Sequence, residues 1–261
     1  MNHNSRNEVC RAGDAGRTDQ ANKNKDRDLE IIPHAPRIKS RRARSKQRKR
    51  VRLYNNAKLP VDSNSTVIIC DWDDTLFPTS WINDNNINLT DIRSRYRYAR
   101  YFDSLDKHLA ATVKKIKKYG NLIIITNASR QWVQITLTVL PKTKEALEDV
   151  PIVSARESFQ NHCGVQDWKK YTFKAELAKE GRTHYKNIVS IGDAHYEHNA
   201  LVGLYKWDVI PHKYLKSVKF TRSTDYSELF RQIEMIGMEI KNIVRAQRHL
   251  DLTLDILKIN D

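Results

Sequence analysis

The sequence VIICDWDDTLFP, residues 67–78, joins four apolar residues directly to three carboxylates. An apolar run without alternation is typical of a strand that is buried on both faces of a parallel sheet. Such sheets bind ligands at the carboxyl ends of their strands, so Asp71, Asp73 and Asp74 lie where a site is expected. Carboxylates this close favour a nearby cation or a protonated neighbour. The alternative is a polar turn in which Asp74 or Thr75 caps a helix.

Two later stretches repeat the pattern of an apolar strand that ends in a polar residue. Leu122–Asn127 contains Thr126 near its end, and Ile188–Asp193 ends in an acid. An amphipathic helix is expected before the first of them, with Asp103 or Ser104 as its cap and Gly120 as its stop. The segment Ser80–Tyr101 is expected to be a polar loop.

The remaining elements complete an alternation of strands and helices. Helices are expected over Arg130–Glu148, with a break at Pro141, over Glu157–Lys179, and from Tyr226 to Ile243 with Ser223 as a cap. Strands are expected at Val150–Ser154, Leu204–Ile210 and Val218–Phe220, whereas Leu250–Leu254 could be helix or strand. This order predicts an α/β fold: a doubly wound, Rossmann-like parallel sheet with helices on both faces and no large cap domain.

The motif Asp71-x-Asp73-x-Thr75 after an apolar strand resembles the first motif of the haloacid dehalogenase-like (HAD) phosphatases. Thr126 at the end of the next long strand resembles their second motif. Gly192-Asp193, followed four residues later by Glu197, resembles the fourth; the second acid of that motif is often Asp, so Glu197 is a mild departure. The third motif is a lysine on the helix before the strand Ile188–Asp193, and the apolar positions of that helix favour Lys169 or Lys170 over Lys174.

The resemblance covers about residues 65–222 and implies a capless, Mg²⁺-dependent phosphatase. Asp71 would be the nucleophile and Asp73 the general acid and base, while Thr126 and the lysine would bind the phosphoryl group. Asp71, Asp73, Asp193 and Glu197 are the candidate metal ligands. Two other classes stay open: a catalytically silent binding protein on the same fold, and a metal-dependent nuclease. His195 and His198 are read as polar surface residues, because no third ligand supports zinc.

Most of the net charge of +15 comes from residues 1–60, which hold 17 Lys/Arg and 6 Asp/Glu. We predict a disordered basic tail over 1–60 and a globular domain over 61–261. Within the tail, Arg37–Arg52 suits a nuclear-import signal or a nucleic-acid contact. Three cysteines and the lack of a long apolar stretch predict an intracellular protein, nuclear or cytoplasmic, without a membrane segment.

The substrate is expected to be a phosphorylated macromolecule. A capless site is open to large substrates, and the segment Ser80–Tyr101 carries four arginines, which bind phosphate through paired N–H groups. The alternative is a solvated loop beside a site for a small phosphate ester. The sequence does not separate a phosphoprotein from a phosphorylated nucleic-acid end.

Overall fold

The computed structural model describes residues 62–206 and 213–254, and all of them belong to one compact unit. The predicted basic tail, with Arg37–Arg52, lies outside the described residues. The strands are β1 Thr66–Cys70, β2 Asn121–Thr126, β3 Ile152–Ser154, β4 Asn187–Gly192, β5 Tyr214–Phe220 and β6 Leu250–Leu254. The helices are α2 Thr79–Asp84, α3 Ile92–Arg97, α4 Ala99–Lys117, α5 Arg130–Leu137, α6 Pro141–Ala146, α7 Ala155–Phe159, α8 Val165–Leu177, α9 His195–Lys206 and α10 Tyr226–Arg245.

The six strands form one parallel sheet in the order β3-β2-β1-β4-β5-β6. The chain builds outward from β1 to β3, then returns and builds outward from β4 to β6. The strand order therefore reverses between β1 and β4, which is where doubly wound sheets bind their ligands. The predicted fold class is confirmed, and Leu250–Leu254 is a strand.

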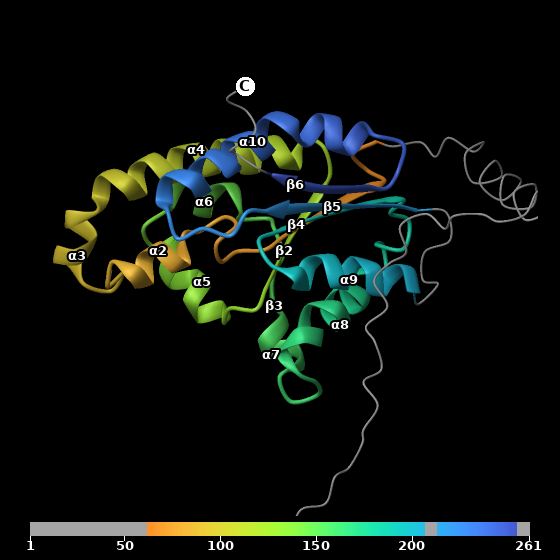
Figure 1. The fold of residues 1–261 in the computed structure, drawn as a ribbon, viewed down its shortest axis with the longest axis horizontal. Coiled ribbons are helices and arrows are strands. Elements are labelled where there is room, and N and C mark those ends of the chain that lie inside the picture. Colours follow the sequence, from red (N-terminus) through yellow and green to blue (C-terminus); the bar gives the residue numbers. More distant parts are fainter. Residues whose placement is uncertain (1–61, 207–212, 255–261) are drawn as a thin grey trace, which may run out of the picture. The chain divides into compact units, whose positions relative to one another are not determined.

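Both faces of the sheet are covered by helices (Figure 1). Alternate residues of β1 point to opposite faces: Ile68 and Cys70 join a core with α4 and α10, and Val67 and Ile69 join a core with α8 and α9. Every residue of β1 is buried for this reason. Gly120, before β2, allows a close approach, because a Cβ there would lie 2.8 Å from Cγ2 of Thr66.

The segment Ser80–Tyr101 differs from the predicted loop. It forms α2, α3 and the first turn of α4. Trp81 of α2 supplies the reason, because its ring packs edge-on against Tyr98 and Phe102 and is tilted against Tyr226. This aromatic cluster also starts α4 at Ala99 rather than at the predicted caps Asp103 or Ser104. The segment nevertheless forms only these short helices between β1 and α4.

Two further expectations near the carboxyl terminus were wrong. Leu204 belongs to α9, not to a strand, because Ala200, Leu201 and Leu204 pack against the sheet at helical spacing; residues 207–210 lie outside the described range. The cap of α10 is Asp225, which accepts a hydrogen bond from the Ser227 N–H, while Ser223 accepts one from the Asp225 N–H. No helix in the described part of the chain is long and apolar enough to cross a bilayer.

Candidate active site

Three predicted site residues meet at the carboxyl ends of three adjacent strands. Asp71 follows β1, Thr126 ends β2, and Asp193 follows β4. The Asp71 N–H donates to the carbonyl of Ile191 at 2.9 Å, which keeps Asp71 in register with β4. Asp71 and Asp193 are each 6 % exposed, and Thr126 is fully buried. The sheet topology therefore places two carboxylates on either side of the point where the strand order reverses.

A tight turn after β1 separates the roles of its three carboxylates. The carbonyl of Trp72 accepts hydrogen bonds from the N–H groups of Leu76 and Phe77, both at 2.9 Å. Asp74 adopts φ 51°, which Asp tolerates better than most residues. Its carboxylate accepts from the Ser80 N–H at 2.7 Å and from the Ser80 hydroxyl at 2.6 Å. Asp74 thus joins the turn to α2.

Asp73 faces a different set of partners. Its Oδ1 accepts hydrogen bonds from the Thr79 hydroxyl and from the indole N–H of Trp132, the latter at 2.9 Å. Burial is the main cause that raises the pKa of Asp73, and the charges of Asp71 and Asp74 add to it, whereas the two hydrogen bonds oppose it. With Oδ1 occupied by two donors, Oδ2 is the oxygen that can carry or accept a proton.

Lys169 of α8 is the lysine that the fold brings to Asp71. Its side chain is 1 % exposed, and Nζ lies 2.7 Å from Oδ1 of Asp71 and forms a hydrogen-bonded ion pair with Oε1 of Glu197. Burial lowers the pKa of Lys169, but the charges of Asp71 and Glu197 outweigh burial and raise it. Lys169 therefore stays charged beside the carboxylates.

The two competing lysines lie elsewhere on α8. Nζ of Lys170 is 3.2 Å from Oδ1 of Asp167, and its aliphatic stem lies near Gly203 of α9. Lys174 is exposed. The geometry thus selects Lys169 from the predicted candidates.

Glu197 is buried under Gly192 and holds Lys169. Its Oε2 accepts a hydrogen bond from the Ala194 N–H at 3.2 Å, while Oε1 binds Lys169. A Cβ on Gly192 would lie 2.3 Å from Cγ of Glu197, so glycine is required for this side chain to fit. Burial raises the pKa of Glu197, and Lys169 opposes the rise.

Asp193 has an environment rich in negative charge. Burial, followed by the charges of Asp71, Glu197 and Asp74, raises its pKa to about 7, and Lys169 opposes this rise. Nε of Arg222, whose side chain is exposed, lies 3.7 Å from Oδ2 of Asp193. Carboxylates that raise one another's pKa are stabilised when a cation binds between them.

The donor set fits a hard cation such as Mg²⁺. Asp71 and Asp193 offer oxygen ligands at adjacent strand ends, and Mg²⁺ is usually bound by one or two carboxylates together with substrate phosphate and water. Over residues 62–206 and 213–254, no group of three or more His, Cys, Asp or Glu side chains is placed to hold a metal. The metal-ligand roles of Asp71, Asp73, Asp193 and Glu197 all stay predictions, and Asp73 and Glu197 have the other partners described above.

Thr126 presents a hydroxyl at the end of β2. Its Oγ1 accepts a hydrogen bond from the Ala128 N–H at 3.0 Å, which leaves the O–H to donate. Within the described residues, Oδ1 of Asn127 and Oγ1 of Thr75 are buried and lack a hydrogen-bond partner. Such polar atoms mark positions where a bound ligand could supply the missing partner.

Sequence reasoning missed Thr79, Trp132 and Arg222. A hydroxyl, an indole and an exposed arginine carry no motif, and only the fold brings them to Asp73 and Asp193. The histidines agree with the reading as polar residues: His195 is exposed, and Nδ1 of His198 lies 3.3 Å from the Ser217 hydroxyl.

Comparisons with known proteins add one likeness. No protein-family model matches the sequence, and no curated protein matches it. This chain is similar to a solved structure from Deinococcus radiodurans R1, which is described as a HAD family hydrolase with bound phosphate and sodium. The structural match has a probability of 1.00, and the two sequences are 12% identical. It covers 71% of this chain and 99% of its own length, with a TM-score of 0.35. The case for an activity therefore rests on the residues of this chain.

Proposed function

We propose that this protein is a phosphoric monoester hydrolase that uses Asp71 as its nucleophile and requires Mg²⁺. The observation that carries this proposal is the buried cluster at the strand ends, in which Lys169 pairs with Asp71 and Asp193 lies on the next strand. The ordered motifs that resemble HAD phosphatases support the same chemistry. Asp71 and Asp193 would hold the metal ion, which supplies positive charge against the phosphate oxygens when bound.

The chain's own residues account for both half-reactions. In the first, an Asp71 oxygen bonds to phosphorus, the bond from phosphorus to the leaving oxygen breaks, and Oδ2 of Asp73 gives that oxygen a proton. In the second, Asp73 takes a proton from water as the water oxygen bonds to phosphorus. The bond from phosphorus to Asp71 then breaks, which releases phosphate and restores the carboxylate.

Lys169 and Thr126 have a shared task in this scheme. Phosphoryl transfer spreads negative charge over the equatorial oxygens, so fixed donors that need no reorganisation lower the barrier. Lys169 is held in place by Glu197, and Thr126 by the Ala128 N–H. A site built only to bind a cation would not need a buried ammonium group against Asp71.

We also propose that the substrate is a phosphorylated macromolecule. Between β1 and α4 the described chain forms only the short helices α2 and α3, which leaves little to enclose a small molecule. The arginines of that segment favour a polyanion.

Asp71→Asn tests the nucleophile. The amide keeps the shape of the side chain but cannot attack phosphorus, so we expect release of phosphate from an aryl phosphate with Mg²⁺ to fall at least about a thousandfold. The matched control is Asp74→Asn, which changes the same charge in the same turn and should keep measurable turnover. Thermal melting checks that both variants fold. The proposal is overturned if Asp71→Asn turns over like the wild type, or if the wild type hydrolyses no phosphate monoester.

A further inference from the structure

Helix α3 carries exposed groups that the fold does not use. No residue of α3 is buried, and Ile92 and Tyr96 are 79 % and 85 % exposed. Arg93 and Arg97 are also exposed, and among the described residues neither forms a salt bridge. From Ile92 to Phe102 the sequence has four arginines and no acid. Two exposed guanidinium groups and an exposed ring on one short helix are groups that a polyanionic ligand could bind.

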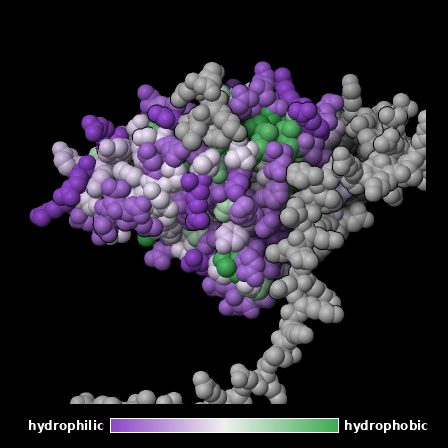
Figure 2. All heavy atoms as spheres, viewed as in Figure 1, coloured by the Kyte–Doolittle hydropathy of each residue, from purple (hydrophilic) through white to green (hydrophobic). Residues whose placement is uncertain are grey.

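Two connections link α3 to elements that contact Asp73. Nη2 of Arg95 donates to the Thr138 hydroxyl at 2.6 Å, at the end of α5, and α5 carries the Trp132 that binds Asp73. On the other side, α2 begins at Thr79, which also binds Asp73. Figure 1 shows α2 and α3 beyond the arrowheads of the strands, and Figure 2 shows mainly hydrophilic residues over α3.

We infer that α3 binds single-stranded nucleic acid, with Tyr96 stacking on a base and Arg93 and Arg97 contacting phosphates. Residues four apart on a helix have Cβ atoms roughly 5–6 Å apart, so the two arginines form a short row beside the tyrosine. Proteins that bind single strands combine such a positive track with an aromatic platform. An acidic peptide would satisfy the arginines, but a single strand presents a planar base beside every phosphate, which suits a ring that is 85 % exposed.

This inference rests on the proposed function for its purpose: a strand bound on α3 would present a terminal phosphate to Asp71. The binding itself is testable without that chemistry. The probe is an unphosphorylated, fluorescently labelled oligonucleotide of about 15 nucleotides, measured by anisotropy with the full chain at several salt concentrations. Residues 1–61 are the same in every variant, so differences between variants report α3.

The variants separate stacking from charge. Tyr96→Ala should weaken binding at least about fivefold, and Tyr96→Phe should restore it, because a phenyl ring still stacks. The double variant Arg93→Ala and Arg97→Ala should make the negative slope of log K against log salt shallower by about 1.4. This is the change expected for two lost phosphate contacts on a single strand.

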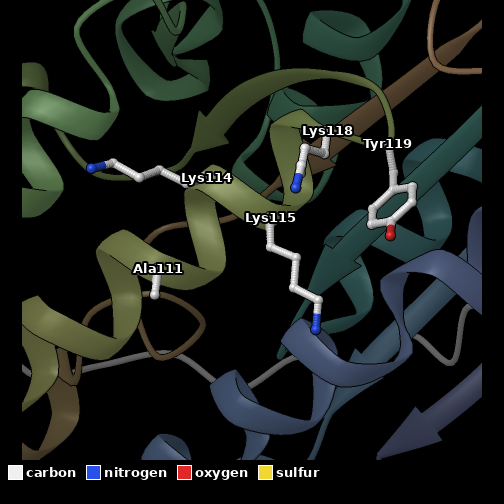
Figure 3. Close-up of a pocket in the computed structure, with 5 residues that line it drawn as sticks. All are labelled: Ala111, Lys114, Lys115, Lys118 and Tyr119. Carbon is white, nitrogen blue, oxygen red and sulfur yellow. The ribbon is translucent and has the colours of Figure 1, made fainter.

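A second basic patch provides the matched control. Lys114, Lys115 and Lys118 line a hollow of about 430 Å³ near the end of α4, together with Ala111 and Tyr119 (Figure 3). This patch precedes β2, so it lies at the opposite edge of the sheet from the site. Lys114→Ala with Lys115→Ala removes the same charge as the double arginine variant and should leave the oligonucleotide affinity and the salt slope as in the wild type.

Each outcome decides the inference. It is lost if the α3 variants bind the oligonucleotide like the wild type, if the lysine control weakens binding as much, or if an acidic phosphopeptide of equal charge binds more tightly and shows the same dependence on Tyr96. It holds if stacking and salt slope change as stated. A wild type without phosphatase activity overturns the proposed function and leaves this binding result standing. An active enzyme whose α3 variants bind normally overturns this inference alone.

Discussion

Trp132 contacts Asp73, the proposed acid and base, through a single hydrogen bond from its indole N–H to Oδ1. Trp132→Phe keeps an aromatic ring beside Phe77, where Trp132 packs edge-on, and removes the indole N–H together with part of the ring volume. We expect kcat/KM to fall about tenfold for an alkyl phosphate, whose leaving oxygen needs a proton, and to fall much less for a nitrophenyl phosphate. Kinetics with both esters measure this ratio.

The control for that residue is Trp72→Phe. Trp72 donates its indole N–H to the Thr136 hydroxyl at 3.1 Å and not to Asp73, so this variant loses an equivalent hydrogen bond elsewhere. Trp72→Phe should lower the melting temperature without changing the ratio of the kcat/KM values for the two esters. Equal losses on both esters in Trp132→Phe would mean that the indole supports the fold and does not position the acid.

At the scale of an element, Lys216 is a buried side chain that caps the carboxyl end of α10. Its side chain is fully buried on β5, and Nζ donates to the carbonyls of Ile243 and Val244, both at 2.8 Å. These carbonyls lie in the last turn of α10 and lack helical partners. Lys216→Met removes both bonds and leaves the Ile243 carbonyl without a donor, while the Val244 carbonyl keeps its bond from the Asn187 amide at 3.1 Å. We expect a loss of about 2 kcal/mol in the free energy of unfolding at pH 7. Denaturant unfolding measures this loss.

The same lysine makes stability depend on pH. Burial lowers the pKa of Lys216 from 10.5 to about 8. Between these values the unfolded chain holds a proton that the folded chain has lost, so stability rises with pH across this window, by at most about 3 kcal/mol. Unfolding at pH 7.5 and pH 10.5 should show a larger rise for the wild type than for Lys216→Met. For Lys115→Met, a substitution at an exposed lysine, the free energy of unfolding should rise with pH as much as in the wild type. An equal rise in Lys216→Met and the wild type would contradict this prediction.

At the scale of the whole molecule, the described residues 62–206 and 213–254 contain the six-stranded sheet and the two hydrophobic cores. Residues 1–60 have few apolar side chains to bury, so their deletion should change the melting temperature little. Loss of their basic residues should weaken polyanion binding, most at low salt. Calorimetry and a heparin-binding assay measure the two effects. A melting temperature lowered by about 5 °C or more would show that the tail stabilises the domain.

Strands and the residues that follow them could be predicted from the sequence because local composition decides them. A run such as Val67–Cys70 has no polar residue to place in water, so burial on both faces is its stable state. Parallel strands bring their carboxyl ends to one edge of the sheet, so the sequence also predicted that Asp71, Thr126 and Asp193 lie close together.

The rest depends on contacts between distant residues. The helices of Ser80–Tyr101 are stabilised by the packing of Trp81 against Tyr226. No pattern within the segment predicts that contact. The choice of Lys169 depends on how α8 is rotated against the sheet, and Trp132 reaches Asp73 only because the fold brings α5 to the turn after β1. Periodicity reports which face of a helix is apolar, but not which neighbour that face meets.

The central position of β1 constrains how the protein folds as it is synthesised. Val67 pairs with Asn121 on one side and with Ile188 on the other. After β2 has emerged from the ribosome, β1 still has an open edge until β4 follows, with α5, α6, α7 and α8 translated in between. An apolar strand with an unpaired edge can pair with another chain during that interval. The strand that precedes Asp71, the proposed nucleophile, is therefore also the strand whose late partner favours slow folding and misassembly.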